Sequence, residues 1–352
     1  MRIGYIITGL TRGGAENQLV NLLTNLRDHD TFVISYVDGP HRKTLESHGI
    51  RVHMVGVDQS AGFWRAFRET RRIITDERPD IVHSFLPHSN IMAKLVRLFS
   101  GHRFGLVTST RVKEISFIMQ NLAERILDPM ADVVTVNSHV LRDYLVKRLL
   151  FGRHKVRVIY NGFVFRDAKA TRLSTTKRVI LTVAQFREQK DHLTNIRTCE
   201  RLVARRKDVL FAYAGDGTLM ERMRQEVRQR GLQEHVRFLG SRDDVPSLLK
   251  GSDVFFLPTL YEGQSNALVE AMHYGCPIVT TDIPENRELV RDAGMLVKPR
   301  DADGMARAIE RVLDESDMAQ GLIEKGKKRS KDFSIMTMVK GYEEVYRRLC
   351  AE

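Results

Sequence analysis

Short apolar runs alternate with longer amphipathic stretches along the whole chain, and this alternation predicts a mixed α/β fold. In the first half, a series of runs predicts strands: IGYII, TFVISYV, VHMVGV, DIVHSF, FGLVTST, DVVTVNS and VRVIYNG. The stretches between them predict helices, for example at residues 15–28. Strands and helices that alternate in this way are typical of an open, largely parallel sheet covered by helices.

A second series of predicted strands follows a polar interval at residues 165–177, the best candidate for a linker: VILTVAQ, VLFAYAG, VRFLG, DVFFLP, PIVTT and GMLVKP. At 352 residues the chain exceeds the size at which a single hydrophobic core stops growing. We therefore expect two doubly wound domains, with ligands bound beyond the carboxyl ends of the strands.

The composition is that of an ordinary globular protein, with 42% hydrophobic and 28% charged residues. The longest apolar runs span only a few residues, which predicts no transmembrane helix. The N-terminus, MRIGYIITGL, is typical of a first strand and not of a cleaved signal peptide. Cys199, Cys276 and Cys350 have no metal-type spacing, which argues against a zinc site or a disulfide framework. We expect a cytoplasmic, reduced protein.

The net charge of +12 is unevenly distributed along the chain. Residues 1–165 hold 23 Lys and Arg against 15 Asp and Glu, which gives +8, and residues 166–352 hold 33 against 29, which gives +4. Residues 63–74 place aromatic and arginine side chains on one predicted helix, which suits an anionic membrane surface. The alternative is a helix that packs its aromatics on the core and exposes its arginines. The sequence has no recognised nucleic-acid-binding motif, so we expect no nucleic acid partner.

The segment at residues 261–289, YEGQSNALVEAMHYGCPIVTTDIPENREL, carries the most informative pattern. Glu262 and Glu270 stand eight residues apart, after the apolar run VFFL and Pro258. We expect Asn266 to cap a helix that begins at Ala267 and ends at Gly275. The N-terminus of such a helix attracts phosphate, and small residues such as Gly263 and Ser265 permit close approach of a ligand. This pattern predicts a pocket for a nucleotide sugar.

This segment resembles the E-x7-E signature of the retaining glycosyltransferases of family 4. Members of that family have the GT-B fold, in which two Rossmann-like domains face each other across a cleft. The resemblance implies that Glu262 meets the reacting sugar and that Glu270 accepts hydrogen bonds from sugar hydroxyls. It also implies a donor-binding role for the residues around them: Gly263, Gln264, Ser265, Asn266 and Ala267. Considered alone, the two glutamates are equally well explained as exposed surface charges.

The first domain carries two further motifs that resemble the family. In TGLTRGGAEN, Gly13 and Gly14 directly precede a predicted helix, where backbone amides suit a phosphate or the transferred sugar. The pattern is not G-x-G-x-x-G, which argues against a nicotinamide or flavin enzyme, and such glycines often only form a turn. In HSFLPHSN, which follows a predicted strand, His88 matches the family's acceptor-side histidine; a solvated loop histidine is the alternative.

Three motifs of the second domain extend the resemblance. In AQFREQKDH, Arg187 and Lys190 suit the diphosphate whose charge grows as the sugar–phosphate bond breaks. The family's arginine usually stands farther from the lysine, which makes Lys190 the firmer assignment. AGDGTLMERM resembles the turn near the nucleotide base, although Gly215 and Gly217 also suit plain turns. FLGSRDDVPSLLKGSD resembles the segment that pairs with the base edge, near Ser241.

Asp301-Ala302-Asp303 is an Asp-x-Asp pattern that begins a predicted helix away from any strand end. We therefore expect a metal-independent enzyme without a cofactor, whose substrate is a UDP- or GDP-linked sugar. The resemblance implies retention of configuration through attack of the acceptor on the same face.

The resemblance also implies domains at 1–165 and 166–334, with residues 335–352 returning to the first. The function expected is transfer of a sugar to a lipid-linked or surface-glycan acceptor, with peripheral contact to the inner face of the cell membrane. Alternatives are a transferase with a soluble acceptor and a sugar-nucleotide epimerase of the same architecture.

Overall fold

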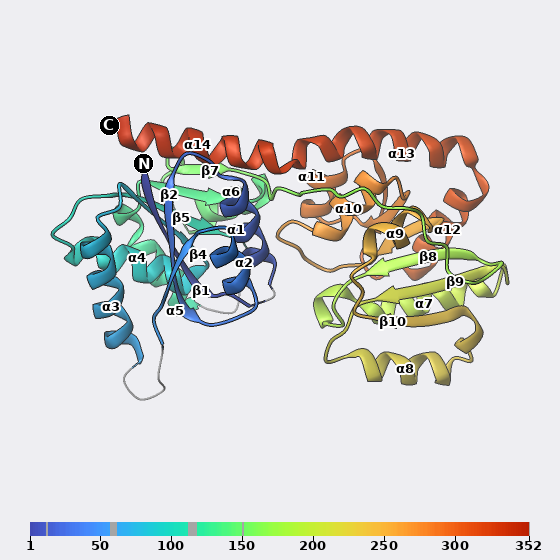
Figure 1. Cartoon of the computed structure of the whole chain (residues 1–352). Coiled ribbons are helices and arrows are strands. Elements are labelled where there is room, and N and C mark those ends of the chain that lie inside the picture. The colour runs from blue at the N-terminus through green and yellow to red at the C-terminus, as the bar shows by residue number, and fades with distance from the viewer. Residues whose placement is uncertain (12, 57–61, 112–117, 150, 352) are drawn as a thin grey trace. The chain divides into compact units, whose positions relative to one another are not determined.

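The structure is a computed structural model that describes residues 1–11, 13–56, 62–111, 118–149 and 151–351, with backbone alone for 118–121. The chain divides into two compact units, whose helices and strands are drawn in Figure 1. The first unit is Met1–Val164 with Phe333–Glu352, and the second is Phe165–Asp332. Each unit is built around one sheet.

The sheet of the first unit has seven strands, all parallel, in the order β3-β2-β1-β4-β5-β6-β7. Ile3 at its centre pairs with Thr31 on one side and with Ile81 on the other. The order reverses between β1 and β4, which is where open α/β sheets bind ligands. The strands are β1 Arg2–Gly9, β2 Asp30–Val37, β3 Arg51–Met54, β4 Ile81–Phe85, β5 Gly105–Thr110, β6 Val133–Val136 and β7 Val156–Val158.

Helices cover both faces of this sheet. Helix α1 (Gly14–Asn25), α2 (His41–Ser47) and α14 (Ile335–Ala351) contribute to one hydrophobic core cluster, and α3 (Gly62–Glu77) and α4 (Pro87–Phe99) to another. Helices α5 (Ile118–Ile126) and α6 (His139–Arg148) and the short 3-10 helix η1 (Asp128–Met130) complete the unit. Helix α1 ends three residues before the predicted position, because the chain becomes extended at Leu26.

Helix α14 brings the end of the chain back to the sheet of the first unit. His83 lies inside β4, where its Nδ1 and the hydroxyl of Tyr346 are 2.6 Å apart and its Nε2 and Ser109 Oγ 2.8 Å apart. Burial lowers the pKa of His83 well below its ordinary value, so the ring is neutral. The predicted strand DIVHSF, which contains His83, is confirmed, whereas the interpretation of HSFLPHSN as a segment that follows the strand was wrong for His83.

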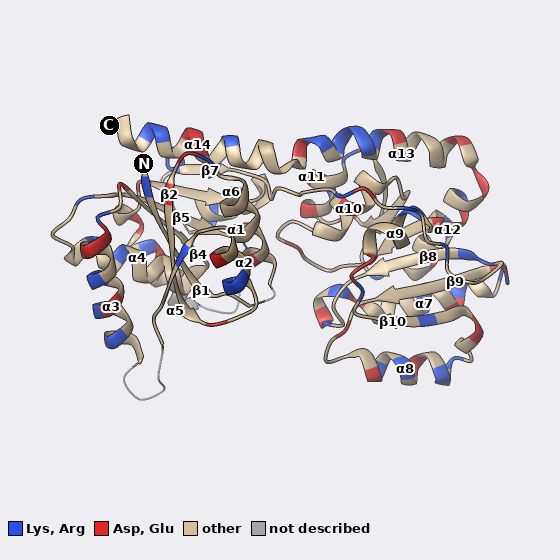
Figure 2. Ribbon diagram, viewed as in Figure 1, with Lys and Arg blue, Asp and Glu red and all other residues tan. Residues whose placement is uncertain are grey.

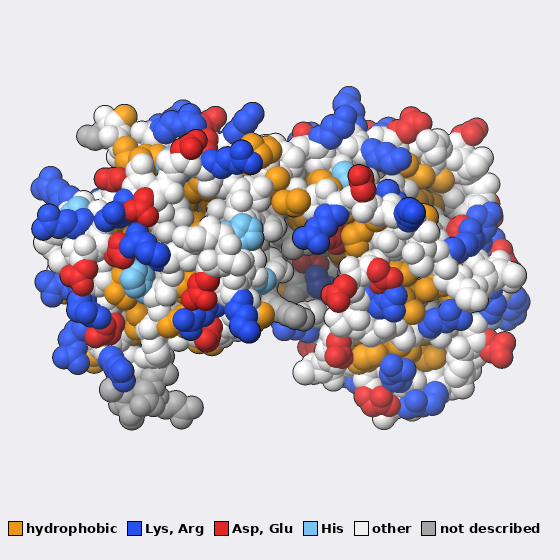
Figure 3. Space-filling model, in the orientation of Figure 1, with side chains coloured by type: hydrophobic (Ala, Val, Ile, Leu, Met, Phe, Trp, Pro, Cys, Tyr) orange, Lys and Arg blue, Asp and Glu red, His pale blue; other side chains and the backbone are white. Residues whose placement is uncertain are grey.

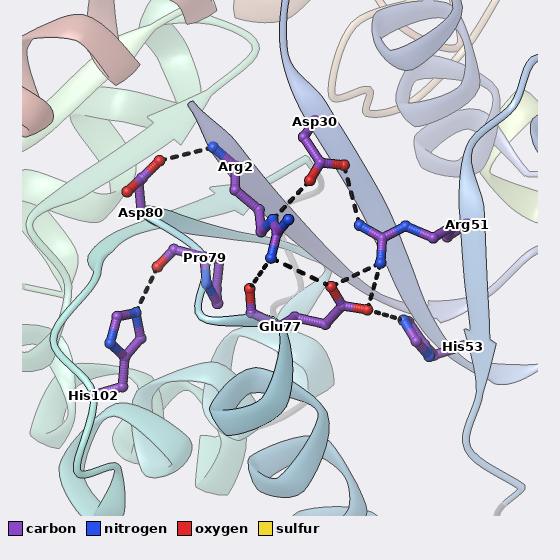
Figure 4. A network of polar contacts seen from close by, with 8 residues as sticks. All are labelled: Arg2, Asp30, Arg51, His53, Glu77, Pro79, Asp80 and His102. Carbon is purple, nitrogen blue, oxygen red and sulfur yellow. Dashed lines mark hydrogen bonds and ion pairs between the residues drawn. The ribbon is translucent and has the colours of Figure 1, made fainter.

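The amino ends of β1, β2 and β3 are joined by a network of charges (Figure 4). Arg2 Nε donates to Asp30 at 2.7 Å, and Arg51 donates to both Asp30 and Glu77, the last residue of α3. His53 Nε2 lies 3.0 Å from Oε1 of the same glutamate. These charges stabilise the amino ends of the strands. They therefore contribute to the fold and not to a site at the carboxyl ends.

The sheet of the second unit has six parallel strands in the order β10-β9-β8-β11-β12-β13, with its reversal between β8 and β11. The strands are β8 Arg178–Val183, β9 Val209–Ala214, β10 Val236–Gly240, β11 Val254–Leu257, β12 Ile278–Thr281 and β13 Gly294–Val297. Helices are α7 His192–Val203, α8 Met220–Gln229, α9 Val245–Lys250, α10 Asn266–Tyr274, α11 Pro284–Val290, α12 Ala302–Asp314 and α13 Ser316–Ser330. The 3-10 helices are η2 Glu188–Lys190, η3 Gln233–His235 and η4 Lys331–Phe333. Every strand predicted from the sequence is present, and only residue 57, at the end of the predicted VHMVGV, lies outside the described residues.

The interval at residues 165–177 contains neither helix nor strand, yet it packs along the second unit. Phe165 stacks on His273 with the ring centroids 3.6 Å apart, and the backbone of Arg166 exchanges hydrogen bonds with the Tyr274 hydroxyl. Lys250 Nζ donates to the carbonyl of Ala168 at 2.8 Å. The segment is therefore fixed to the second unit by side chains of α9 and α10.

Candidate functional site

The carboxyl ends of β8 and β11, at the reversal point of the second sheet, bring two predicted catalytic residues together. Lys190 ends η2 after β8, and Glu262 lies in the loop after β11. Lys190 Nζ donates to Glu262 Oε1 at 2.5 Å, and only 8% of Glu262 is exposed. A largely buried carboxylate needs such a partner, because removing an ionised group from water is costly. The pair thus fixes an ammonium and a carboxylate at one point of the sheet edge.

Gln189 also positions Glu262, and the sequence analysis missed it. Its Nε2 donates to Glu262 Oε2 at 3.3 Å and to the carbonyl of Tyr261 at 2.6 Å. The backbone carbonyl oxygen of Gln189 accepts from Leu260 N at 2.8 Å and from Thr259 Oγ1 at 3.0 Å. These bonds hold the two loops together. A glutamine in a polar loop gives no pattern from which this could have been read.

Helix α10 begins one residue earlier than expected. Ser265 is the N-cap and Asn266 the first helical residue, whereas the sequence analysis placed the cap at Asn266 and the start at Ala267. The reason is backbone conformation, since Ser265 is extended and its carbonyl already accepts the first helical bond from Val269 N. Gly263 and Gln264 form the half-buried loop before the cap. The end of the helix at Gly275 is confirmed, with a φ of +73° that suits glycine.

Glu270 is the fifth residue of α10, about one turn inside the helix as predicted. Burial raises the pKa of its carboxyl group to about 7, from an ordinary value of 4.5. Within the described ranges, no residue donates a hydrogen bond to this carboxylate. An unpaired carboxylate in such surroundings is available to hydroxyl donors of a ligand.

Arg187 lies in the same short turn as Lys190, whose N–H donates to the Arg187 carbonyl at 3.0 Å. Its side chain is exposed, and its role toward a phosphate stays a prediction. Asp191, with a φ of +44°, ends the turn and caps α7 by accepting from Thr194 N at 3.3 Å. The loop that carries Arg187 and Lys190 is therefore fixed at both ends.

Gly215 and Gly217 have a clear packing reason at the carboxyl end of β9. Their φ values are +151° and +154°, and a Cβ on Gly215 would overlap the carbonyl oxygen of Ala184. A Cβ on Gly217 would come within 2.7 Å of the Phe186 backbone. The glycines let the loops after β8 and β9 approach closely. Ser241 lies exposed just after β10, and contacts of these residues with a nucleotide stay predictions.

In the first unit, the predicted residues gather at the other reversal point, between β1 and β4. Gly13 is the N-cap of α1 and Gly14 its first residue, and His88 is the second residue of α4. Leu86, just before α4, has a φ of +76°, which is unusual for a side chain other than glycine. Its N–H donates to Ser109 O at 3.3 Å, and its carbonyl accepts from Asn90 N at 2.9 Å. These bonds hold the strained turn that presents His88.

The acidic groups of the Asp-x-Asp pattern are engaged within the fold. Asp301 caps α12, as predicted, by accepting from Gly304 N at 2.8 Å. Asp303 pairs with Arg201 at 3.6 Å and Arg205 at 3.8 Å. In the described part of the chain, no group of three His, Cys, Asp or Glu side chains is placed to hold a metal ion. None of the described helices is both long and apolar enough to span a bilayer.

Comparison with known proteins gives the family. Residues 12–164 match the family described as Glycosyltransferase Family 4, and residues 164–329 match Glycosyl transferases group 1. A GalNAc-alpha-(1->4)-GalNAc-alpha-(1->3)-diNAcBac-PP-undecaprenol alpha-1,4-N-acetyl-D-galactosaminyltransferase of Campylobacter jejuni is 25% identical over 355 residues, 95% of each chain. A UDP-Gal:alpha-D-GlcNAc-diphosphoundecaprenol alpha-1,3-galactosyltransferase of Escherichia coli is 26% identical, over 69% of each chain.

Solved structures show the same fold. The crystal structure of Anabaena HepE in complex with UDP superposes with a TM-score of 0.87 at 20% identity, covering 99% of this chain and 100% of that one. Two parallel-sheet Rossmann-like domains, two family matches in tandem and glycosyltransferase relatives agree with one another. The chain belongs to the group 1, family 4 glycosyltransferases of the GT-B fold.

Proposed function

We propose that this glycosyltransferase transfers a sugar from a UDP- or GDP-linked donor to a lipid-linked acceptor, with retention of configuration and without a metal ion. The observation that carries the proposal is the Lys190–Glu262 pair at the reversal point of the second sheet. This pair lies beside the loop that leads into α10, and the N-terminus of a helix attracts phosphate. The names of two relatives contain a PP-undecaprenol and a diphosphoundecaprenol acceptor, which supports the lipid-linked class.

Charge on the leaving diphosphate is the main electrostatic demand of the reaction. Lys190, already held by Glu262, supplies an ammonium that needs no reorganisation as that charge develops. Arg187 extends from the same turn and adds a second cation. The N-terminus of α10 adds the partial positive charge of its helix dipole. These groups take the part that a divalent cation plays in metal-dependent transferases.

The two glutamates contact different parts of the donor. Glu262 meets the reacting sugar, and Glu270 accepts hydrogen bonds from the hydroxyls of the nucleotide's ribose. Because Glu262 is held in an ion pair with Lys190, it is a poor candidate for a covalent nucleophile. The acceptor oxygen instead bonds to the anomeric carbon on the face from which the phosphate oxygen departs. The acceptor's proton passes to that phosphate oxygen, which balances the step and retains the configuration.

The engagement of Asp301 and Asp303 within the fold supports the metal-independent part of the proposal. Family membership favours transfer over the epimerase alternative, because the relatives are named transferases. A soluble acceptor remains the alternative within the class.

A membrane surface is proposed as a further partner, through α3. Phe63 and Trp64 are 47% and 72% exposed, so the alternative that these aromatics pack on the core is wrong for both. Phe67 is partly buried and packs against the core, as that alternative expects, and it contacts Phe99 of α4 edge-on with ring centroids 5.9 Å apart. Arginines follow along the same helix in Figure 2, and the side of α3 that packs inward is small or apolar: Ala66, Thr70, Ile73 and Ile74. Exposed aromatics beside arginines suit an anionic bilayer.

The proposed function is tested by a panel of UDP- and GDP-linked sugars. A donor at a hundred times its dissociation constant should raise the free energy of unfolding by about 2.7 kcal/mol, which a thermal melt detects. The donor that stabilises the protein is then incubated with lipid-linked acceptors, and NMR spectroscopy reads the anomeric configuration of the product. An inverted product would contradict retention, and no stabilisation by any donor would contradict the assignment of the pocket.

A further inference from the structure

A hollow of about 560 Å³ lies in the first unit, between α14 and the edge strand β7 (Figure 1). This volume is within the range of pockets that bind small molecules. Arg157 of β7 pairs with Thr135 of β6, and the Thr135 hydroxyl lies 2.6 Å from Ser109 Oγ. Ser109 and Tyr346 of α14 both contact the ring of His83, so these side chains share the face of the sheet that α14 covers. Paired residues project from the same face of a sheet, which places Arg157 on the side of α14.

The predicted site residues and the proposed membrane contact lie elsewhere. Gly13, Gly14 and His88 follow β1 and β4, and none of them lines this hollow. Helix α3 packs on the opposite face of the sheet, because Tyr5 belongs to the core cluster of α14 and Ile6 to that of α3. Successive side chains of a strand point to opposite faces. A bilayer that contacts α3 therefore leaves the hollow uncovered, and we expect its ligand to come from solution.

Cations from two distant parts of the chain line the hollow: Lys155 and Arg157 at β7, and Arg348 on α14. Within the described residues, neither arginine has an ion-pair partner or a hydrogen-bond acceptor. Lys155 Nζ donates to the carbonyl of Asp128 at 3.4 Å and keeps further donors. A single exposed arginine is an ordinary surface feature. Two unpaired arginines that line one hollow from a strand and a helix are a more specific arrangement, because each raises the positive potential at the other.

The carboxylates of the lining do not balance these cations. Asp132 accepts hydrogen bonds from both terminal nitrogens of Arg97, so its charge is already compensated. The other carboxylate is that of Glu344, one turn before Arg348 on α14, and no described residue forms an ion pair with it. Three cations against this one carboxylate leave an excess of two positive charges. An anion bound in the hollow would neutralise that excess.

The rest of the lining is apolar and has room for a ligand. Val133, Ile159 and Val345 contribute side chains that can pack on C–H groups. Gly341 lines the hollow from within α14, although glycine is unfavourable inside a helix. A Cβ there would lie 3.4 Å from Ile159 Cγ2, an ordinary contact, so close packing does not require the glycine. The missing side chain instead leaves space in the hollow.

We propose that this hollow is a second binding site, which takes a soluble phosphate ester that carries hydroxyl groups. Arg157 and Arg348 bind the phosphate, because a guanidinium donates charge-assisted hydrogen bonds to it. Glu344 accepts hydrogen bonds from the hydroxyls, and Ile159 and Val345 pack on the C–H groups. The proposal goes beyond the proposed function, because this site lies apart from the residues proposed for donor and acceptor.

The test is calorimetry on the full chain with ribose 5-phosphate, inorganic phosphate and ribose, with UDP in excess to fill the proposed donor pocket. The wild type should bind ribose 5-phosphate more tightly than phosphate, and ribose least. R157Q/R348Q should weaken binding of both phosphates about tenfold or more for each arginine lost. The control R27Q/R103Q makes the same change in net charge at two exposed arginines of the first unit that do not line the hollow. It should bind as the wild type does.

E344Q distinguishes a sugar phosphate from a bare anion. Inorganic phosphate should bind this variant more tightly, because repulsion by the carboxylate is lost. Ribose 5-phosphate should lose hydrogen bonds from its hydroxyls to a charged acceptor, so its affinity relative to that of phosphate should fall about tenfold. An unchanged ratio would overturn the assignment of a hydroxylated ligand.

Two results with the arginine variants would overturn the site itself. One is equal binding by the wild type and R157Q/R348Q, or no binding by the wild type at millimolar concentration. The other is equal weakening in R157Q/R348Q and in the control, because binding would then reflect net charge alone. Thermal melts check that each variant is folded. These outcomes do not depend on the proposed function, because they compare binding at this hollow and not transfer of a sugar.

Discussion

At the scale of single residues, Glu270 has the clearest electrostatic signature. Burial raises the pKa of its carboxyl group to about 7, and within the described ranges nothing donates to it. The neutral form is thus favoured below about pH 7 in the folded protein without ligand. A carboxylate that a fold leaves unpaired in this way is a candidate for ligand binding. Its titration therefore reports directly on the proposed donor pocket.

The first prediction follows from that raised pKa. Below pH 4.5 the carboxyl is protonated in both the folded and the unfolded chain, so it has no effect on stability. Between pH 4.5 and about 7 the unfolded chain ionises first, and the wild type loses stability as the pH rises. The glutamine of E270Q cannot ionise. The free energy of unfolding of E270Q minus that of the wild type should therefore rise by at most about 3 kcal/mol by pH 8. Urea titrations from pH 4.5 to 8 measure this, with E324Q of α13 as control; a constant difference between E270Q and wild type would contradict it.

The second prediction concerns the donor, and its dependence on pH has the opposite sign. Ribose hydroxyls donate to the ionised carboxylate, so the affinity for UDP should increase up to about pH 7 and then level off. E270Q should bind UDP more weakly at pH 8, by roughly 1.5–3 kcal/mol, and should lose the pH dependence. Calorimetry at pH 6, 7 and 8 measures both effects. An equal pH dependence in the variant would place the titrating group elsewhere.

The third prediction concerns the Lys190–Glu262 pair. K190A should lower turnover on the order of 10²–10³, because the ammonium acts on charge that develops in the transition state. R187A should lower it less, and K207A, which removes another lysine of the second unit, should have no effect. E262Q should lower turnover more than donor affinity, since its partner is the reacting sugar. Steady-state kinetics and thermal melts are measured together, because loss of folding that accounts for the lost activity would make Lys190 structural.

The sequence indicates which residues matter here better than it indicates how they are held. Lys190 and Glu262 stand 72 positions apart, and the resemblance to a family named both. Their direct pairing depends on the order of the strands, which brings the ends of β8 and β11 together. Gln189 had no distinguishing pattern, because a glutamine in a loop is an ordinary surface feature. The strain at Leu86 likewise depends on partners distant in sequence.

At the scale of elements, the sequence predicts strands and helices well and their ends less well. The parallel strands are buried on both faces, so each reads as a short apolar run, and all were found. Helix starts depend on one or two dihedral angles, and that of α10 shifted by one residue. The interval at 165–177 has the composition of a free linker, yet side chains of α9 and α10 fix it. Such contacts have no local signal.

The fourth prediction belongs to α3. Its four arginines, Arg65, Arg68, Arg71 and Arg72, should each contribute about 1 kcal/mol near an anionic surface. The wild type should sediment with anionic vesicles, less so with neutral ones, and less at 1 M salt, where the Debye length is about 3 Å. Changing all four to Gln should reduce sedimentation, and W64A should reduce it at any salt concentration.

A control with the same change in net charge alters four exposed arginines of the second unit: Arg222, Arg228, Arg237 and Arg307. Basic and acidic side chains are interspersed over the face seen in Figure 3, so a loss of four charges elsewhere should have little effect. Equal sedimentation of the α3 variant, the control and the wild type would end the assignment of α3 and favour a soluble acceptor.

At the scale of the whole molecule, the two sheets share one design. Each is parallel, each reverses its strand order once, and in each some of the predicted site residues follow the strands that flank the reversal. Lys190 and Glu262 follow β8 and β11, and Gly13 and His88 follow β1 and β4. This agreement was predictable from the sequence, because alternating strands and helices imply the architecture and the motifs fall at strand ends. The identities of the base, the sugar and the linkage have no comparable signal.

The fifth prediction tests metal independence for the whole enzyme. Transfer activity should be unchanged in excess EDTA, because in the proposed mechanism Lys190, Arg187 and the start of α10 stabilise the leaving diphosphate. The assay is run after dialysis against the chelator, with and without added Mg²⁺ or Mn²⁺. Loss of activity in EDTA with recovery on Mn²⁺ would refute this part of the account.

The central claim is transfer of a sugar from a nucleotide to a lipid-linked acceptor, and one measurement tests it most directly. UDP- and GDP-linked sugars carrying a radiolabel are incubated with the wild type or E262Q and with diphosphate-linked polyprenol acceptors. The label that moves into the organic phase is then counted. The account predicts labelled lipid with at least one donor and the wild type, and far less with E262Q. Label that stays entirely in the aqueous phase, as a free isomerised sugar or a soluble product, would contradict it.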